Sequence, residues 1–517
     1  MNPAHDIELL LAYGIASGLL SKLDVPQARN ALLETLRLEE PECETGCKEV
    51  FLGTDNTSPA PLLENLIAYA LQKGIIENDT ETERDLFDTK LMGCLMPRPS
   101  EVAATFTALE EEYGPKAACD WFYDLCGKSG YIRTERVAKN IGWVHESPYG
   151  PLEVTINLSK PEKDPLEVAR LKTIPQVGYP KCQLCLSNVG YPGRLNHPAR
   201  QTLRVIPTEL NGEQWYFQFS PYVYYNQHCI VLREEHIPMK ISRDTIVRLM
   251  EFITRFPHYF IGSNAGLPIV GGSILNHDHF QGGVWDMPMA RAEAVVHLKQ
   301  NRWPGLRAEI VRWPMSALRL RHNDPETLTE AAAAVLNAWE KHSDESLGIL
   351  AHTECMPHNA ITPIARRRGS DYELDIVLRN NRTDVAHTMG IFHVHDDLHH
   401  IKKENIGLIE VMGLFILPGR LESEFEGLAR ILCGKVPFDA TVLEDPKNPL
   451  NKHLNWLRDM MTQHGLQESY ENAMALIRRQ CGEKCVRVLD DCGVYKDNPE
   501  GLAGFLRFVN TLGYVSM

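Results

Sequence analysis

Apolar residues recur at helical spacing through the first part of the chain. Between Pro61 and Gly74, apolar side chains follow the proline every three or four residues, and the glycine comes just after the last of them. A proline at the first helical position and a glycine past the end mark the limits of many short helices. The pattern predicts a mostly helical region up to about Trp143.

Beyond residue 200 the pattern becomes typical of strands. The segments Trp215–Phe219 and Tyr222–Leu232 are rich in aromatic and β-branched residues, which favour strands. Apolar residues at helical spacing then extend from Ser242 to Phe256, where Pro257 ends the run. This order predicts a helix with Ser242 as its N-cap.

A second set of elements follows in the same order. A helix is predicted after Asp324, and a strand is predicted over residues 371–378, where apolar and acidic residues alternate. Gly390–His395 then has two histidines at strand spacing, as Gly271–Gly283 has earlier in the chain. Two strand–helix–strand units that each carry a His-x-His pair predict a duplicated half. The remainder, from about Leu421, is predicted to be helical.

The segment Gly271–Gly283 is the strongest candidate for a functional site. If it is extended, residues two apart share a face, so His277, His279 and Gln281 point the same way. Paired glycines at both ends lack a Cβ and let the backbone approach a bulky group. Two imidazoles and an amide framed by glycines suit a phosphate. The alternative is a buried strand whose histidines are hydrogen-bonded within the core.

Composition narrows the class of protein. The 517 residues are 44% hydrophobic and 23% charged, with a formal net charge of −15, typical of a globular protein of two or three compact units. The negative balance argues against nonspecific binding to nucleic acid or anionic lipid, which both reward clustered lysine and arginine. The first residues lack the positive charge of a signal peptide, and no apolar run reaches roughly 20 residues. We therefore expect a cytoplasmic protein without nucleic acid or a membrane as partner.

The 13 cysteines form no regular framework, which indicates reduced thiols rather than a disulfide scaffold. The pairs Cys43 with Cys47 and Cys481 with Cys485 are interpreted as helix neighbours or incidental. The segment Leu158–Gly178 is rich in lysine, glutamate and proline and is predicted to be a linker.

Cys182 and Cys185 have the two-residue spacing usual for a zinc knuckle. With one histidine from the following sheet and His277, they would complete a closed tetrahedral site. From the sheet we choose His236, with His228 as the second choice. Such a zinc ion would be structural and would fix the strand that carries the next histidine. The alternative is a Cys-x-x-Cys pair without metal.

His279 is then the candidate nucleophile. A neutral imidazole attacks phosphorus at neutral pH if one ring nitrogen is unprotonated and the other is held by a hydrogen bond. Gln281 cannot supply a proton to a leaving group or activate water, but its amide can donate to a phosphoryl oxygen. The pair favours transfer to a second phosphate over hydrolysis.

Basic residues recur in the segment Gly130–Asn140. Arg133, Arg136 and Lys139 are three residues apart and could share one face of a helix. The alternative is a charged face in solvent.

Motifs along nearly the whole chain resemble those of one family. They are Tyr131–Thr134, Cys182–Cys185, Tyr224–Ile230, Phe256–Asn264, Gly271–Gly283 and Lys402–Gly413. With these motifs the chain resembles the UDP-glucose–hexose-1-phosphate uridylyltransferases (galactose-1-phosphate uridylyltransferases) of the second, mainly bacterial type, in the histidine-triad superfamily. The better-studied type has His-Pro-His-Gly-Gln where this chain has His277-Asp278-His279-Phe280-Gln281, and the changed residues fall on the opposite strand face.

The resemblance implies a ping-pong reaction of the Leloir pathway of galactose metabolism. His279 would take the uridylyl group of UDP-glucose, and Gln281 would contact the transferred phosphoryl group. Glucose 1-phosphate would leave, and galactose 1-phosphate would attack the uridylyl-histidine to give UDP-galactose. The family usually forms homodimers, so a homodimer is expected.

The resemblance also implies a set of substrate contacts. The expected substrate-binding residues are Asn264, Gly272, Ser273, Arg133, Arg136, Lys403 and Glu410. For Glu410 the alternative is an ordinary structural carboxylate. His393, His395, His399 and His400 are numerous enough for a second metal, but no matching glutamate is identifiable, and they are interpreted as lining the acceptor pocket.

The expected fold is α+β, with two histidine-triad-like halves of antiparallel sheet and packed helices. Four parts are predicted: a mostly helical N-terminal region (1–157), a first half with the nucleophile and zinc site (158–310), a second half with acceptor contacts (311–420) and a helical C-terminal region (421–517). A histidine-triad nucleotide hydrolase or phosphorylase acting on a nucleoside diphosphate sugar is the alternative enzyme. A zinc-stabilised nucleotide-binding protein is the alternative without catalysis.

Overall fold

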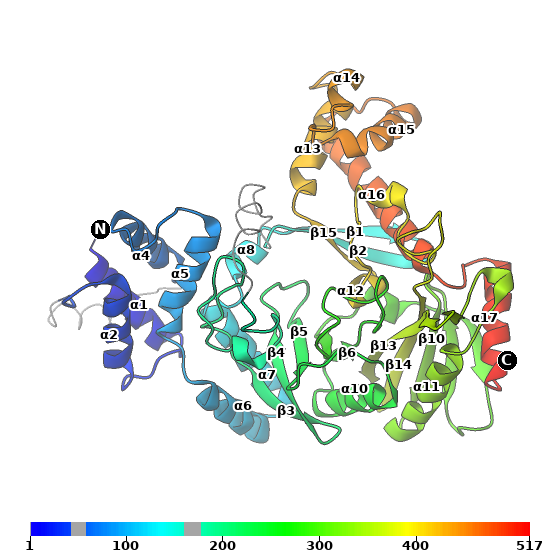
Figure 1. Cartoon of the computed structure of the whole chain (residues 1–517), viewed down its shortest axis with the longest axis horizontal. Coiled ribbons are helices and arrows are strands. Elements are labelled where there is room, and N and C mark those ends of the chain that lie inside the picture. The colour runs from blue at the N-terminus through cyan, green and yellow to red at the C-terminus, as the bar shows by residue number, and fades with distance from the viewer. Residues whose placement is uncertain (1, 43–57, 160–176) are drawn as a thin grey trace. The chain divides into compact units, whose positions relative to one another are not determined.

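The computed structural model describes residues 2–42, 58–159 and 177–517 (Figure 1). The chain forms two compact units. One comprises residues 1–135, 163–223 and 227–236, and the other comprises residues 136–162, 224–226 and 237–517. The Cys43–Cys47 pair and most of the predicted linker lie outside the described residues.

The predicted helical character of the N-terminal region is confirmed. The helices are α1 (Pro3–Ala16), α2 (Val25–Leu36), α4 (Ala60–Gln72), α5 (Glu81–Gly93), α6 (Pro99–Tyr113), α7 (Pro115–Lys128) and the short α8 (Thr134–Val137). The helix expected after Pro61 is α4, and Gly74, which follows it, has φ +65°. Glycine adopts this left-handed conformation without strain, which explains why the helix ends there.

Strands replace helices directly after α8. β1 (Ile141–Ser147) and β2 (Gly150–Asn157) form an antiparallel hairpin, and β15 (Leu414–Pro418) runs parallel to β2. The apolar pattern of the sequence did not predict these strands. They connect the end of the helical region to a segment more than 250 residues later in the chain.

Three antiparallel strands form a meander after residue 200: β3 (Ile206–Leu210), β4 (Glu213–Phe219) and β5 (Cys229–Arg233). The predicted strand at Trp215–Phe219 is confirmed as β4. The prediction over Tyr222–Leu232 was wrong for its first seven residues, because the chain turns there and Gln227 has φ +52°.

A helix and a strand pair follow this meander and complete a first repeat. They are α10 (Arg243–Arg255), whose N-cap is Ser242 as predicted, and the antiparallel pair β6 (Phe260–Gly262) and β7 (His279–Gly283). A second meander, a helix and a second antiparallel pair follow: β8 (Ala294–Lys299), β9 (Arg307–Val311), β10 (Ala317–His322), α11 (Pro325–Trp339), β13 (Asn359–Arg368) and β14 (Asp371–Asn380). The predicted duplication is confirmed, since meander, helix and strand pair occur twice in the same order.

The two antiparallel pairs lie side by side in one sheet. From β16 (Val515–Ser516), the hydrogen-bonded strand order in the second unit is β16-β8-β9-β10-β14-β13-β6-β7. β6 pairs with β13 through Gly262 opposite Ile364. Equivalent strands of the two repeats therefore meet at the β6–β13 pairing. A separate hairpin, β11 (His352–Thr353) and β12 (Met356–Pro357), precedes β13.

Two strand predictions were wrong. Gly390–His395 forms turns that lead into the 3₁₀ helix η4 (Asp396–Leu398), and Gly390 has φ +115°. In the order of the repeat, the counterpart of β7 is β14, which contains no histidine. The stretch Gly271–Gly283 is extended as a strand only from His279 onward.

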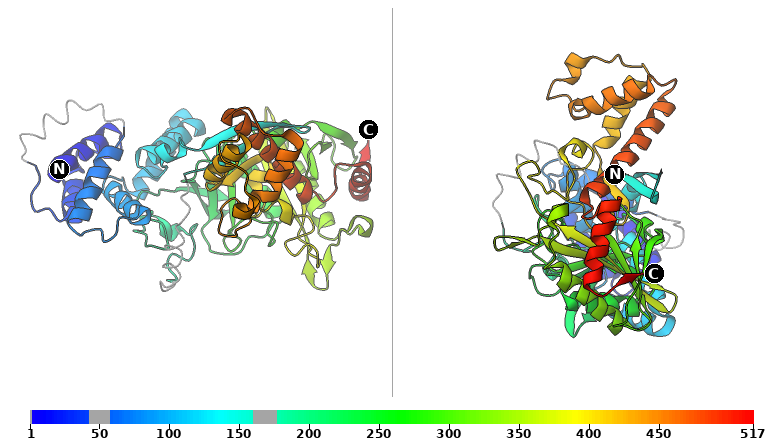
Figure 2. Two further views of the ribbon diagram at one scale, coloured as in Figure 1. Left: turned by 90° about the horizontal axis from the view of Figure 1, so that it is seen from above. Right: turned by 90° about the vertical axis from the view of Figure 1, so that its right-hand side faces the viewer.

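The C-terminal region is helical, as predicted. Its helices are α13 (Leu421–Leu432), α14 (Ala440–Leu443), α15 (Leu454–His464), α16 (Tyr470–Cys492) and α17 (Pro499–Thr511), and the short α12 (Leu408–Val411) precedes this region. In the right view of Figure 2, the orange helices α13–α15 gather around the upper part of α16 and stand out from the sheet. One apolar core runs from β13 and β14 through α12 and β15 into α13 and α16. In the described part of the chain, no helix combines the length and apolar character that crossing a membrane requires.

Candidate active site and metal centre

The register of β6 and β7 sets the geometry of the candidate active site. Gly262 lies opposite Gln281, and Phe260 lies opposite Gly283. Directly opposite residues in an antiparallel pair point to the same face. Extending the register by two residues places Asn264 level with His279. His279, Gln281 and Asn264 therefore share one face, as the sequence predicted for the first two.

The missing side chain of Gly262 makes room for α12 on this face. A Cβ at Gly262 would lie 2.8 Å from Leu408 Cδ1. The backbone N–H of Leu408 donates to Asn264 Oδ1 at 2.8 Å. A Cβ at Gly272 would lie 2.7 Å from Asn264 Nδ2. The Asn264 amide is thus held between the glycine-rich loop and the start of α12.

One ring nitrogen of His279 is hydrogen-bonded, and this hydrogen bond fixes the tautomer of the imidazole. Its Nδ1 lies 2.8 Å from the carbonyl oxygen of His277. Because a carbonyl only accepts, Nδ1 carries the hydrogen and Nε2 carries the lone pair. Burial lowers the pKa of His279 to about 4, so the imidazole is neutral near pH 7. The ring therefore meets the predicted requirement for a nucleophile.

Glu410, a predicted substrate contact, is held by Lys402. Lys402 Nζ donates to Glu410 Oε1 and to the Ile416 carbonyl, each at 2.9 Å. The N–H of Gly407 donates to the other carboxylate oxygen at 3.2 Å. Burial works against the charge of Lys402, but the facing carboxylate outweighs it and raises the pKa of the ammonium. Lys403 is exposed, as is Ser273 in the glycine-rich loop.

Two further predicted contacts come from the segment around α8. Arg133 forms a two-pronged ion pair with Asp88, at 2.5 and 2.8 Å. Arg136 is in α8, whose four residues end at Val137. The prediction that Arg133, Arg136 and Lys139 share a helical face was wrong, because α8 is too short to contain all three.

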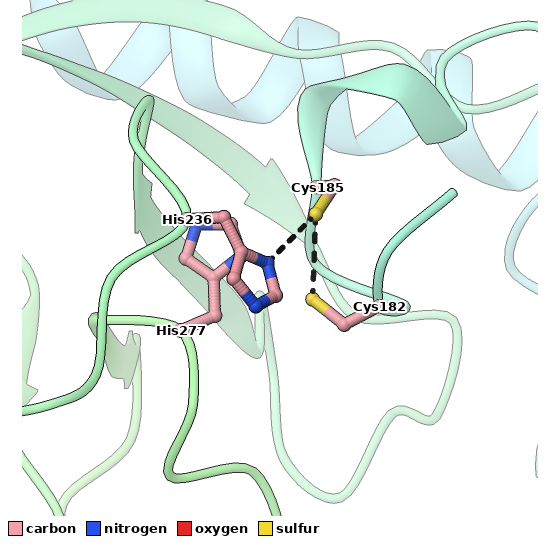
Figure 3. Close-up of side chains that lie close together, drawn as sticks. All are labelled: Cys182, Cys185, His236 and His277. Carbon is pink, nitrogen blue, oxygen red and sulfur yellow. Dashed lines mark hydrogen bonds between the residues drawn. The ribbon is translucent and has the colours of Figure 1, made fainter. Parts of the chain in front are cut away.

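The structure brings the four predicted metal ligands together. The Sγ atoms of Cys182 and Cys185 are 3.5 Å apart, and Cys185 Sγ is 3.1 Å from His236 Nδ1. With His277, one ligand atom from each residue lies within 4.8 Å of all the others. Figure 3 shows the four side chains turned toward one another. The second choice, His228, lies outside this group and its Nδ1 donates to the Tyr222 carbonyl at 2.8 Å.

Two thiols and two imidazoles fit zinc, which prefers four sulfur and nitrogen ligands in a tetrahedron. Burial raises the pKa of Cys182 to about 11, so the thiol stays protonated unless a cation stabilises the thiolate. The chemistry of the ligand set supports a closed structural site. His277 is one of the four clustered residues, and its carbonyl also accepts from His279 Nδ1. The candidate metal ligand His277 and the candidate nucleophile His279 are therefore directly linked.

The sequence analysis missed three residues near this face. Lys402, rather than its neighbour, is the buried partner of Glu410. Leu408 positions Asn264 through its backbone N–H, which no side-chain pattern reveals. Arg379 is buried on β14 with 1% of its surface exposed. A basic residue at the end of a strand expected to be buried was the one available signal for Arg379.

Comparisons with known proteins agree along most of the chain. The galactose-1-phosphate uridyl transferase family matches with its N-terminal domain over residues 44–238 and its C-terminal domain over residues 251–442. The galactose-1-phosphate uridylyltransferase of Caldanaerobacter subterraneus is 50% identical over 516 residues, which are 99% of this chain and 98% of the relative. That of Bacillus subtilis is also 50% identical over 516 residues, with the same coverage. That of Halalkalibacterium halodurans is 51% identical over 510 residues, 98% of each chain.

Among solved structures, a yeast Ap4A phosphorylase aligns with 63% of this chain and 88% of its own, at 10% identity and a TM-score of 0.32.

Proposed function

The chain belongs to the galactose-1-phosphate uridylyltransferase family, and from this membership we propose that it exchanges a uridylyl group between UDP-glucose and galactose 1-phosphate through a covalent intermediate on His279. It is an enzyme, a nucleotidyltransferase of galactose metabolism. We place the reaction in the Leloir pathway and assign it a ping-pong order.

The fixed tautomer of His279 is the observation that carries the proposal. The His277 carbonyl holds the Nδ1 hydrogen at 2.8 Å, which leaves Nε2 with a lone pair. Burial keeps the ring neutral by lowering its pKa to about 4. An imidazole in this state attacks phosphorus without a separate base.

In the first half-reaction, His279 Nε2 attacks the uridine-linked phosphorus of UDP-glucose. The new N–P bond replaces the P–O bond to glucose 1-phosphate, which leaves as an anion and needs no proton. In the second half-reaction, a phosphate oxygen of galactose 1-phosphate attacks the same phosphorus. The N–P bond breaks, UDP-galactose leaves, and the lone pair returns to Nε2.

Neighbouring groups support transfer over hydrolysis. Gln281 shares the face of His279 and can donate an amide hydrogen to a phosphoryl oxygen, but it cannot activate water. Asn264 and Gly272 are neighbours, since a Cβ at Gly272 would lie 2.7 Å from Asn264 Nδ2, and they would cradle the same phosphate. Contacts of substrate with Ser273, Arg133, Arg136, Lys403 and Glu410 stay predictions.

Three further features belong to the proposal. The predicted ligands Cys182, Cys185, His236 and His277 would hold a structural zinc ion that fixes the start of β7. The protein would act as a homodimer in the cytoplasm. The four-part division at residues 157, 310 and 420 would separate the N-terminal helices, the nucleophile half, the acceptor half and the C-terminal helices.

Mass spectrometry of the intact protein tests the proposal. After mixing with UDP-glucose, we expect a uridylyl adduct that disappears when galactose 1-phosphate is added. His279→Ala should show no adduct, whereas an adduct of unchanged yield in that variant would refute the assignment of the nucleophile. Steady release of UMP without acceptor would instead identify a hydrolase. If no adduct forms at all, a nucleotide-binding protein without catalysis is favoured.

A further inference from the structure

Arg379 is a buried cation without a carboxylate of its own. Its side chain lies on β14 and is 1% exposed. Nη2 donates to the Ile406 carbonyl at 3.1 Å, whereas Nε and Nη1 have no hydrogen-bond partner among the described residues. Burial lowers the pKa of this guanidinium. Buried arginines are normally paired, since an uncompensated charge in the interior is strongly unfavourable.

A second buried arginine on the neighbouring strand shows the usual arrangement. Arg319 on β10 is 2% exposed and bonds both oxygens of Asp375, at 2.6 and 3.0 Å. Its remaining hydrogens reach the carbonyls of Met289 and Ala292, at 2.8 and 3.0 Å. Every nitrogen of Arg319 has a partner. Arg379 therefore differs from Arg319, which is paired with a carboxylate through two nitrogens.

The nearest carboxylate does not supply the missing charge. Glu410 attracts Arg379 electrostatically, but its oxygens already accept from Lys402 and from the N–H of Gly407. Two buried cations therefore share one buried anion. The surroundings of Arg379 carry about one excess positive charge, which an anionic ligand would neutralise.

Two other partnerless donors lie beside Arg379. His393 is fully buried, and neither of its ring nitrogens makes a well-formed hydrogen bond among the described residues, although the Val394 backbone interacts with the ring. Thr362 on β13 is also fully buried with a partnerless hydroxyl. Arg379 lies opposite Ala360, and Thr362 lies two residues farther along β13, so the two side chains share a face. Burial, and then the Arg379 charge, lower the pKa of His393 to about 4, so its neutral ring offers one N–H.

These donors lie on the face that carries the nucleophile. Ile364, two residues from Thr362, is opposite Gly262, which is opposite Gln281. Residues two apart share a face, so a polar row crosses the strands from His279 through Asn264 and Thr362 toward Arg379. At about 4.8 Å per strand, Thr362 is two strands from β7 and Arg379 is three.

Arg379 and Asn264 are both hydrogen-bonded to one short segment, residues 406–408. Arg379 holds the Ile406 carbonyl, and two residues later the N–H of Leu408 holds Asn264. The guanidinium is therefore anchored to the same short segment that positions the Asn264 amide. A ligand bound by Arg379 on this face would be directed toward His279.

We propose that Arg379, with Thr362 and His393, binds the phosphate group of the hexose 1-phosphate substrate. A guanidinium fork matches two phosphate oxygens, and a hydroxyl and a neutral imidazole supply further donors. The assignment rests on the proposed function and adds a substrate-binding residue from the second repeat.

The substitution Arg379→Met separates binding from structure. Loss of an arginine that stabilises the fold would lower the thermal midpoint. Removal of an uncompensated buried charge should instead leave the thermal midpoint unchanged or raise it. The KM for galactose 1-phosphate should rise about 10- to 100-fold, as expected for lost charged hydrogen bonds. Inhibition by UMP should be unchanged, because UMP lacks the hexose phosphate. Arg379→Lys should give an intermediate KM.

Arg319→Met is the matched control, since it removes a buried arginine that is fully paired. Its thermal midpoint should fall because fully buried Asp375 loses one of its two arginine partners and keeps only Arg366. The proposal is overturned if Arg379→Met loses stability as Arg319→Met does, if the KM and the UMP inhibition constant rise together, or if neither changes. If Arg379→Met does not fold, an unchanged KM in Arg379→Lys overturns the proposal.

Failure of the proposed function is distinguishable from failure of this inference. If the wild type forms no uridylyl adduct, the proposed reaction fails, and calorimetric titration with inorganic phosphate still tests the anion site. Saturable binding to the wild type that is lost in Arg379→Met supports the site. Equal heats for the two proteins, or no binding to either, overturn it.

Discussion

The substitution Gly262→Ala should disturb both the fold and the candidate active site. The added methyl group would lie 2.8 Å from Leu408 Cδ1 and 2.8 Å from the Pro363 carbonyl, whereas nonbonded carbon atoms prefer about 3.5 to 4.0 Å. The carbonyl belongs to β13, which the pairing with β6 holds in place. Leu408 is therefore the group that must move. Its N–H donates to Asn264 at 2.8 Å, so the strain reaches the substrate face.

The expected loss of stability is a few kcal/mol. Forcing an extra methyl group into a packed interior costs about 1 to 3 kcal/mol. Weakening the Leu408–Asn264 hydrogen bond adds about 1 kcal/mol. The lower entropy of the unfolded chain offsets less than about 1 kcal/mol of this. We expect Gly262→Ala to lower the free energy of unfolding by about 2 to 3 kcal/mol.

Urea unfolding and steady-state kinetics check both consequences. Gly142→Ala is the matched control, because Gly142 is also in a strand and a Cβ there would meet nothing closer than Thr155 Oγ1 at 3.7 Å. The control should change stability by less than about 0.5 kcal/mol. Gly262→Ala should also lower kcat/KM, since Asn264 loses its support. Equal urea midpoints for the two variants would refute the packing argument, and a destabilised variant with wild-type kcat/KM would refute the link to the site.

Three other changes have expected outcomes. Glu410→Gln should lower the free energy of unfolding by about 3 kcal/mol, because Lys402 stays buried without a counter-ion, and the double variant with Lys402→Met should recover part of that loss in urea unfolding. Cys185→Ser should reduce bound zinc from about one ion per chain, as measured by elemental analysis, and lower the thermal midpoint. Burial, partly offset by Glu424, lowers the pKa of fully buried His453. Since the unfolded histidine binds a proton below about pH 6.5, stability should fall as pH drops from there toward 5, and fall less in His453→Gln.

The sequence predicted elements well wherever local periodicity decides the structure. Ser242 caps α10, and the glycine after α4 ends that helix. The same reasoning failed at Gly390–His395, where alternation matched a strand but no partner strand is available and the backbone turns at φ +115°. A strand needs a neighbour to hydrogen-bond, and local alternation does not show whether one exists.

Burial of charged residues was also invisible in the sequence. Alternating acidic and apolar residues over 371–378 predicted a strand, which β14 confirms. Yet Glu373 and Asp375 are fully buried, because Arg319 and Arg366 from neighbouring strands pair with them. Such pairs form between residues far apart in sequence, so no local pattern shows them.

The candidate site was predicted in part. The four cysteine and histidine ligands were predicted from spacing and from the ligand preference of zinc, and the structure brings them together. His277, however, leaves the strand and provides a carbonyl to His279, which the strand pattern does not include. Backbone groups of turns carry no sequence signature, so hydrogen bonds of this kind have to be seen in the structure.

The two repeats carry different side chains beside the β6–β13 pairing. Gln281 lies opposite Gly262 of β6, and Asp375 lies opposite Ile364 of β13. His279 and Glu373 lie two residues before them on the same face. Both carboxylates are fully buried in ion pairs with arginines.

The two ends of β14 differ in whether their charged residues are paired. At Glu373 and Asp375 its charges are balanced by arginines, and that end contributes to stability. At Arg379 the charge is unbalanced, and that end lies on the side of the β6–β13 pairing where His279 is found. A symmetric pair of sites would need a neutral imidazole in each repeat. Under the proposed reaction, one repeat would instead provide the nucleophile, and the other would provide the cation that binds the phosphate of the substrate.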